Sequence, residues 1–413
     1  MYTGIKFNHT LRAKRGVIYR GENKNMAFLT EHDKTYKTPE DICAHLGDDY
    51  ARFEGAIVPP IYQNTLFVQP TEANGIEHTD YAYSRTSNPT VEIAELKIAA
   101  LEGAEGALVF STGVAAINTA VLHFVRAGSH VILVDSSYGC TMAFVRGYLH
   151  DRFGITYTNV DGSDPEEIRR AIRPETSLIC LESPSSLIFR MQDLAAVAEI
   201  AREHGIGTVI DNTYATPLYQ HPLSHGIDIV CHTATKYLGG HSDIMGCALC
   251  ARREIIESIQ NNERSLIGAC MDPHQAWLLI RGMRTMPVRL KQHAENAAKV
   301  AAFLETHPKV ERVIYPGSET YPQKGLFDRY MTGQNGLMSI CLRGDADDAR
   351  RFVSRLHYFQ NGCSWGGFES LAIFIGDVRP ASAPESGAKN LVRLHIGLED
   401  AGTLIADLQN ALG

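Results

Sequence analysis

The sequence predicts an α/β protein with a mostly parallel central sheet, a smaller C-terminal α+β domain and an extended N-terminal arm. Three observations lead to this fold class. Strand-like and helical stretches alternate through the middle of the chain, which is the pattern of a parallel sheet with helices on both faces. The pattern changes near Arg281, and the residues before position 87 show little helical or strand periodicity.

The N-terminal part, residues 1–86, is predicted to be an extension followed by an arm. Residues 1–40 are polar and weakly patterned. Residues 55–70 are apolar, but Pro59, Pro60 and Pro70 interrupt them. Prolines at this density favour an extended segment over a helix or a central strand.

The central part, residues 87–282, is predicted to hold the main sheet. Apolar residues recur at helical spacing over 90–104, so we expect a helix there. Helical stretches such as 193–203 lie between later apolar runs and would allow those runs to form parallel strands. The strands that we expect span 130–134, 155–160, 177–181, 208–210, 227–231 and 247–251.

The C-terminal part, residues 283–413, has a different texture that predicts a smaller α+β domain. It begins with a long helical stretch at 288–306. Strands are expected around 310–315 and 338–342, and helices at 345–356 and 401–412.

Composition excludes several classes of partner. The chain has 413 residues, 44% of them hydrophobic, and a formal charge of −8, which argues against nucleic acid as a partner. No apolar run approaches the ~18 residues of a membrane span, and no apolar core follows the basic N-terminal residues, as a secretory signal would require. Nine cysteines, several in apolar strands, suit reduced thiols in a cytoplasm. Cys247 and Cys250 have no second pair, and we expect no metal site.

Lys236 is the first candidate catalytic residue. It lies in a turn just after the apolar stretch 227–231, with Thr233 and Thr235 before it and glycines after it. Such a lysine can form a Schiff base while nearby hydroxyls bind a phosphate, as pyridoxal phosphate (PLP) requires. Taken alone, the pattern is equally compatible with a solvated lysine at a loop exit.

Asp211 strengthens the PLP hypothesis. It ends the apolar stretch 207–210, so it points into the crevice where open α/β sheets bind ligands. A carboxylate beside the pyridine nitrogen of PLP keeps that nitrogen protonated, which makes the ring a better electron acceptor.

The segments 211–217 and 233–243 resemble the Cys/Met-metabolism family of PLP enzymes, the trans-sulfuration enzymes, and the resemblance runs from about Ile42 to the C-terminus. The resemblance implies the PLP-dependent transferase-like fold of type I, with PLP bound by the central domain. It also implies a small sulfur amino acid as substrate and a homotetramer, a dimer of dimers whose active sites are shared between subunits.

The family resemblance assigns further residues to the cofactor. Gly113 and Val114 open a predicted helix after an apolar stretch, and helix N-termini bind phosphate through backbone amides. By resemblance, Thr233 and Thr235 also contact the phosphate. Tyr83 and Arg85 would clamp it from the neighbouring subunit, although the residues alone indicate only an arginine in a surface turn. Tyr138 would stack on the cofactor ring and assist proton transfer; by itself it is compatible with a half-buried turn aromatic.

The substrate carboxylate requires a cation, and Arg393 lies in an otherwise apolar strand. The resemblance assigns this arginine, assisted by Ser364, to the carboxylate. The alternative is an internal salt bridge, because an arginine in an apolar strand needs a partner.

Three positions resemble the bacterial cystathionine β-lyases within the family. Trp365 stands where γ-acting relatives usually carry leucine, and Cys363 stands where γ-lyases and γ-synthases typically carry glutamate. Ser186 replaces an asparagine of many relatives, and we place it with Trp365 on the substrate side. We therefore expect β-elimination of cystathionine to homocysteine, pyruvate and ammonia. Tyr138 followed by Cys140 resembles methionine γ-lyase instead, so γ-elimination of the methionine or cystathionine γ-lyase type remains the alternative.

Readings from two other classes are weaker. Residues 362–366 match the Gly-x-Ser-x-Gly pattern of serine hydrolases, with Ser364 as nucleophile and Asp377 and His395 following in hydrolase order. The sequence after the motif is a poor start for the helix that this pattern requires. A regulator that had kept the fold without its activity would have lost site residues that this chain retains.

Overall fold

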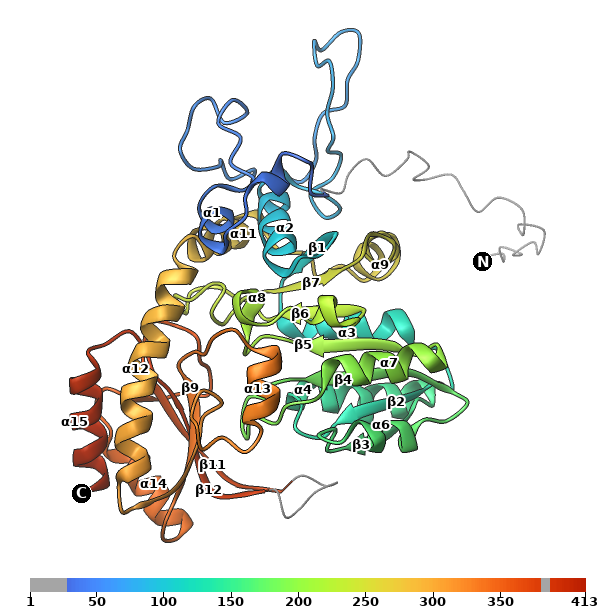
Figure 1. The fold of residues 1–413 in the computed structure, drawn as a ribbon. Coiled ribbons are helices and arrows are strands. Elements are labelled where there is room, and N and C mark those ends of the chain that lie inside the picture. Colours follow the sequence, from blue (N-terminus) through green and yellow to red (C-terminus); the bar gives the residue numbers. More distant parts are fainter. Residues whose placement is uncertain (1–27, 380–386) are drawn as a thin grey trace, which may run out of the picture.

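The computed structural model describes residues 28–379 and 387–413. The first 27 residues of the predicted N-terminal extension lie outside this part. Two sheets dominate the structure, and helices pack around them (Figure 1). No helix of the described ranges is long and apolar enough to cross a membrane.

The larger sheet has seven strands in the order β1-β7-β6-β5-β4-β2-β3. All six predicted strands are present, and the sheet gains a strand that was not predicted, β1. Every neighbouring pair is parallel except those of β7, which runs antiparallel to both β6 and β1. The strands are β1 (Gly106–Phe110), β2 (His130–Val134), β3 (Thr156–Val160), β4 (Thr176–Glu182), β5 (Gly207–Asp211), β6 (Ile229–His232) and β7 (Cys247–Ala251).

Both faces of this sheet are buried, which explains the continuous apolar runs in its sequence. Val131 and Leu133 of β2 belong to one hydrophobic core, and Ile132 and Val134 belong to the other. Helices α2 (Pro89–Glu102) and α7 (Leu194–His204) pack on the second face, and α3 (Gly113–Phe124) packs on the first. The remaining helical segments of this part are α4 (Gly139–Ala143), η2 (Phe144–Leu149), α5 (His150–Phe153), α6 (Pro165–Ala171), α8 (Thr216–Tyr219), η3 (Pro222–His225), α9 (Arg253–Ile259), η4 (Gln260–Arg264), α10 (Ser265–Ile267) and α11 (Pro273–Arg284).

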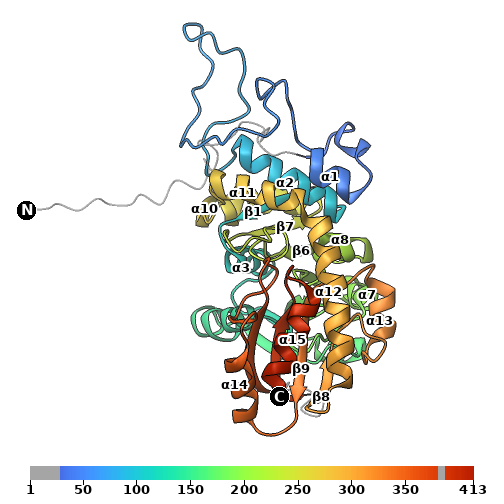
Figure 2. The ribbon, with the colours of Figure 1, turned by 90° about the vertical axis from the view of Figure 1, so that its left-hand side faces the viewer.

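The smaller sheet has five strands in the order β10-β11-β12-β9-β8, and all its neighbours are antiparallel except β10 and β11. Helix α12 (Met286–Thr306) runs from the larger sheet to the smaller one, as Figures 1 and 2 show. The predicted strands and helices of this part are confirmed within two residues. They and the others are β8 (Val310–Ile314), α13 (Lys324–Tyr330), β9 (Leu337–Leu342), α14 (Ala346–Arg355), β10 (Gln360–Asn361), β11 (Leu371–Val378), β12 (Ala388–His395) and α15 (Ala401–Leu412).

The N-terminal arm carries little regular structure, as predicted. After η1 (Asp33–Thr35) and α1 (Pro39–His45), residues 46–88 contain no helix or extended ladder, only an isolated bridge between Leu66 and Tyr83. The loops of this arm project beyond the sheets (Figures 1 and 2). Lys97 of α2 fixes α1 to the body, because its Nζ donates to the carbonyls of Ile42 and Cys43 at 3.1 and 3.2 Å.

Candidate active site

The candidate site lies where parallel strands of the larger sheet end. Asp211 is the last residue of β5, Glu182 is the last residue of β4, and the two are paired in register. Lys236 lies in the turn that follows β6. Because the carboxyl ends of parallel strands meet at one edge, these side chains share the crevice in which α/β sheets bind ligands.

Lys236 presents its amine to a loop of the smaller sheet. Its Nζ donates to Ser364 Oγ at 2.7 Å and lies 5.3 Å from the centre of the Trp365 ring. Burial, followed by the positive charge of Arg393, lowers the pKa of Lys236 to about 8. A neutral fraction of the amine is therefore present near neutral pH, which suits a nucleophile or a general base.

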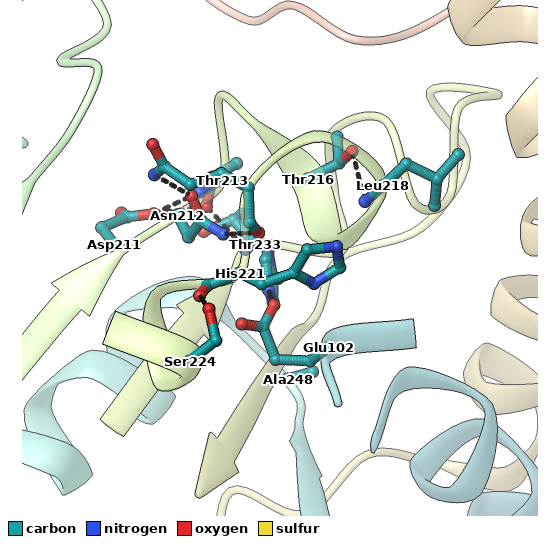
Figure 3. Close-up of polar contacts among 12 residues, drawn as sticks. Glu102, Asp211, Asn212, Thr213, Thr216, Leu218, His221, Ser224, Thr233 and Ala248 are labelled. Carbon is teal, nitrogen blue, oxygen red and sulfur yellow. Dashed lines mark hydrogen bonds and ion pairs between the residues drawn. The ribbon is translucent and has the colours of Figure 1, made fainter. Parts of the chain in front are cut away.

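Asp211 is half-buried in the same crevice. Its Oδ1 accepts hydrogen bonds from the backbone N–H of Thr213 at 3.0 Å and from the Thr213 hydroxyl at 2.5 Å. Figure 3 shows Asp211 beside Thr213, whose hydroxyl also accepts the backbone N–H of Thr233 at 2.8 Å. Burial raises the pKa of Asp211, and its contacts with Thr213 oppose that shift. The contacts thus support an ionised carboxylate despite its burial.

The start of α3 forms a cradle beside the Lys236 turn. Gly113 is the first residue of α3, after the N-cap Thr112. A Cβ atom on Gly113 would lie only 2.9 Å from Thr233 Oγ1, so the absence of a side chain keeps this space open. Free amides at a helix start together with a hydroxyl fit a phosphate group. Val114 follows Gly113 and is exposed, whereas the Thr235 hydroxyl accepts the backbone N–H of Gly246 at 3.1 Å.

Tyr138 lies on the loop between β2 and α4 and is half exposed. A hydrogen bond with Cys140, followed by burial, raises the pKa of Tyr138 to about 12, so the phenol stays protonated at neutral pH. The backbone N–H of Tyr138 donates to Glu182 Oε2 at 2.5 Å, and that of Ser186 donates to Glu182 Oε1 at 2.9 Å. Sequence reasoning did not identify Glu182, although an acid that ends a buried strand beside Asp211 is the same signal.

The smaller sheet supplies the opposite wall. Arg393 of β12 is buried and donates from Nη2 to the carbonyl of Cys363. Burial lowers the pKa of Arg393, and an arginine side chain keeps its charge in proteins. Trp365 packs on Tyr237, the residue after Lys236, with 5.5 Å between the ring centres. The structure therefore brings Ser364 and Trp365 to Lys236 and holds Arg393 against Cys363 of the same loop.

Tyr83 and Arg85 are not joined to this site within one chain. The Arg85 Nη1 donates to the carbonyl of Ser265, and its guanidinium lies 5.5 Å from the centre of the Tyr83 ring. Among the residues that the structure describes, neither has a hydrogen bond or an ion pair to Lys236, Asp211 or Thr233. Their contribution to a neighbouring subunit stays a prediction.

The serine hydrolase hypothesis is wrong. No helix follows Ser364; the chain passes through bends to β11. The Ser364 hydroxyl contacts the Lys236 amine, whereas His395 Nε2 lies 3.1 Å from both the N–H of Gly366 and the carbonyl oxygen of Gly367. Asp377 accepts the backbone N–H of Asn390, so these three side chains form no triad.

The lysine amine, the acid at the adjacent strand end and the open helix start fit PLP, and with this fold they define a PLP-dependent enzyme of fold type I. Comparison with known proteins agrees. Residues 40–413 match the family model described as Cys/Met metabolism PLP-dependent enzyme. The chain belongs to that family.

Several relatives are similar over most of this chain. L-Methionine gamma-lyase of Pseudomonas putida is 39% identical over 380 residues, which cover 89% of this chain and 95% of the relative. Cystathionine gamma-lyase of Bacillus subtilis is 39% identical over 365 residues, covering 87% and 94%. The crystal structure of metB from Corynebacterium glutamicum has a TM-score of 0.85 at 32% identity, covering 92% and 98%.

The chain is thus a PLP-dependent carbon–sulfur lyase of the trans-sulfuration group, which acts in sulfur amino-acid metabolism. The two enzymes reported above are named γ-lyases, and the crystal structure shares the fold of this chain. No β-lyase is named among these three relatives. The comparisons therefore favour the alternative of γ-elimination over the expected β-elimination.

Proposed function

We propose that this protein catalyses γ-elimination of a sulfur amino acid, with L-methionine as the preferred substrate, giving 2-oxobutanoate, ammonia and methanethiol. The observation that carries the proposal is the exposed Cys140, two residues after Tyr138, which contributes to the raised pKa of the Tyr138 phenol. This pair resembles the one in methionine γ-lyase, and relatives of that name from Pseudomonas putida and Treponema denticola are 39% and 35% identical to this chain.

The residues of the larger sheet would hold the cofactor. PLP supplies an electron-withdrawing pyridine ring that is conjugated to the amino nitrogen of the substrate. Asp211 would hold a proton on the ring nitrogen, and Lys236 would bind the aldehyde carbon. The amides of Gly113 and Val114 and the Thr233 hydroxyl would bind the phosphate, with Thr235 beside them. Tyr83 and Arg85 would reach the phosphate from a neighbouring subunit.

The residues of the smaller sheet would orient the substrate. Arg393 and Ser364 would bind its carboxylate, which places the Cα proton near the Lys236 amine. The neutral amine, favoured by the lowered pKa of Lys236, would accept that proton. After releasing it, the amine would accept a second proton from Cβ, because a group can leave from Cγ only once Cβ has lost a proton. Tyr138 stays protonated well above neutral pH and would donate a proton to the leaving sulfur.

An uncharged distal group on the substrate suits this wall. The side chains at 363 and 365 are cysteine and tryptophan, and neither carries a carboxylate that would bind a second ammonium group. The methyl thioether of methionine needs no such partner, whereas the distal end of cystathionine carries one amine and one carboxylate. This difference supports methionine over cystathionine as substrate.

The second candidate is β-elimination of cystathionine, and Trp365 favours it. This side chain is buried beside Lys236 and resembles the tryptophan of bacterial cystathionine β-lyases. The two reactions differ in the keto acid that they release, so one experiment separates them.

A substrate panel tests the proposal. Purified enzyme is incubated with methionine, cystathionine, cystine or O-acetylhomoserine, and 2-oxobutanoate and pyruvate are quantified. We expect 2-oxobutanoate and methanethiol from methionine. The Lys236→Ala variant, which lacks the amine, should release neither keto acid and should lack the yellow colour of bound PLP. Pyruvate and homocysteine from cystathionine, without turnover of methionine, would overturn γ-elimination in favour of the second candidate.

A further inference from the structure

Glu182 is a buried acid at the centre of the candidate site that the proposed reaction does not use. It ends β4, exposes only 5% of its surface and is in register with Asp211 on the neighbouring strand. An acid in such a position is costly unless its oxygens have partners. Its partners therefore indicate why the fold retains it.

Both oxygens of Glu182 accept backbone N–H groups from loops that carry predicted site residues. Oε2 accepts the N–H of Tyr138, on the loop after β2, and Oε1 accepts the N–H of Ser186, on the loop after β4. One side chain thus connects the loops that follow two neighbouring strands of the sheet, β2 and β4. The loop after β2 carries the aromatic ring that is predicted to stack on the cofactor.

The charge state of Glu182 follows from its surroundings. Burial and the neighbouring Asp211 raise the pKa of Glu182 to about 8, so at neutral pH it is mostly the neutral acid. The other charged group that faces it is Arg393, from β12 of the smaller sheet. A neutral acid is matched in charge and shape by glutamine, which makes glutamine the conservative replacement at this position.

We propose that Glu182 is a positioning residue that fixes Tyr138 and Ser186 around the cofactor through their backbone amides. The proposal rests on the cofactor site proposed above, and it concerns the placement of the Tyr138 ring rather than a direct role in proton transfer.

The test compares Glu182→Ala and Glu182→Gln with a matched control, Asp407→Asn. Asp407 is also a buried carboxylate that accepts backbone N–H groups, those of His357, Tyr358 and Phe359, but in the C-terminal domain away from β4 and β5. Each holoenzyme is measured for the rate of cofactor release during dialysis, the visible circular dichroism per bound cofactor, kcat, KM and the melting temperature.

We expect Glu182→Ala, which leaves two buried N–H groups without acceptors, to release cofactor and to lose kcat by roughly ten-fold each, with KM changed less than about two-fold. The visible dichroism should fall as well. Glu182→Gln retains one acceptor oxygen and should recover most of each property. Asp407→Asn should lower the melting temperature alone.

Two further comparisons keep the inference falsifiable. If Glu182→Ala fails to fold, Glu182→Gln, which keeps only one of the two acceptor oxygens, must still show a small but measurable fall in visible dichroism. In a Tyr138→Ala background, removal of Glu182 should cost little additional kcat, because the two residues act together. Loss of melting temperature alone in both Glu182 variants overturns the inference, whereas an unmodified enzyme that binds no PLP at Lys236 overturns the proposed function instead.

Discussion

In the part of the chain that the structure describes, Lys97 is fully buried and Lys236 is half-buried, and burial lowers the pKa of each to about 8. Their partners differ. The Lys97 amine is held by two backbone carbonyls of α1, whereas the Lys236 amine contacts a single hydroxyl, that of Ser364, at the edge of the larger sheet. A lowered pKa therefore does not identify the catalytic lysine; its position after a parallel strand does.

Lys97 predicts a rise in stability at alkaline pH. Its pKa falls from the usual 10.5 to about 8 in the folded protein, so between these values the unfolded chain binds the extra proton. The free energy of unfolding then increases with pH across this window, by up to about 3 kcal/mol from this group. Thermal unfolding of the unmodified protein and of Lys97→Met is compared from pH 7.5 to 10.5. The free energy of unfolding of the unmodified protein should rise with pH relative to that of Lys97→Met.

Lys299→Met provides the control for this measurement. Lys299 is an exposed lysine of α12, and its replacement should give a difference that stays constant over the same range. If the free energy of unfolding of Lys97→Met also differs from that of the unmodified protein by a constant amount, the lowered pKa of Lys97 is contradicted.

At the residue scale, the sequence reveals functional residues that stand out from the residues next to them in the chain. Lys236 and Asp211 follow apolar strands, and Arg393 interrupts one, so each is visible as a polar residue in an apolar setting. Glu182 also ends an apolar strand, but no step of the proposed reaction requires an acid at this position. Its role depends on amides of two loops, and such contacts between distant segments leave no local pattern.

The strands themselves were predicted more completely than their directions. β7 was expected in a mostly parallel sheet, yet it runs antiparallel, because residues 233–246 between β6 and β7 contain no helix that could return the chain. β1, β10 and β11 were not predicted as strands. β11 is only partly buried and contains bulges near Gly376, so its apolar alternation is irregular.

The loop between β10 and β11 reaches Lys236 because Gly366 allows close contact. Its φ is +86°, and a Cβ there would lie 2.7 Å from the backbone N of Tyr237 and 2.8 Å from the backbone carbonyl carbon of Lys236. We expect Gly366→Ala to push this loop away from Lys236, lowering kcat/KM by at least about ten-fold and stability by roughly 1–3 kcal/mol. Steady-state kinetics and thermal unfolding measure both effects.

Gly376→Ala separates the close contact from the backbone conformation. Gly376 has a similar φ of +88°, but its nearest neighbour, Phe374 Cζ, would be 3.9 Å from the new Cβ. Gly376→Ala should carry the conformational cost with little effect on kcat/KM. Equal effects of the two variants on kcat/KM would contradict the proposed contact.

At the scale of the whole molecule, the arm and the segment that its Arg85 contacts both expose apolar side chains. Ile57, Leu66 and Val68 of the arm are exposed, as are Leu266 and Ile267 beside the residue that Arg85 contacts. Exposed apolar patches of this kind mark sites of association. These exposed side chains therefore support the prediction that Tyr83 and Arg85 serve the site of another subunit, within a homotetramer.

Subunit mixing tests this prediction. Arg85→Ala and Lys236→Ala should each be inactive alone. In mixed dimers one site would receive both defects and the other neither, so random mixing should restore about a quarter of the unmodified activity. Co-expression with separable tags, followed by the keto-acid assay, measures the recovery.

A mixture of Lys236→Ala with Asp211→Ala provides the control, because both residues lie in the same chain's part of the site. Every site in that mixture retains one defect, and no activity should return. If the Arg85 mixture also stays inactive, Arg85 serves its own chain.

The site draws on two sheet layers that meet at the Lys236–Ser364 hydrogen bond. On the proposed assignment, residues of the larger sheet bind the cofactor, and residues of the smaller sheet bind the amino-acid substrate. Substitutions at residues 363–365 would then change which thioether the enzyme accepts, while the residues that hold PLP stay the same. A few substitutions in one segment would then be enough for related proteins of this fold to acquire new substrates.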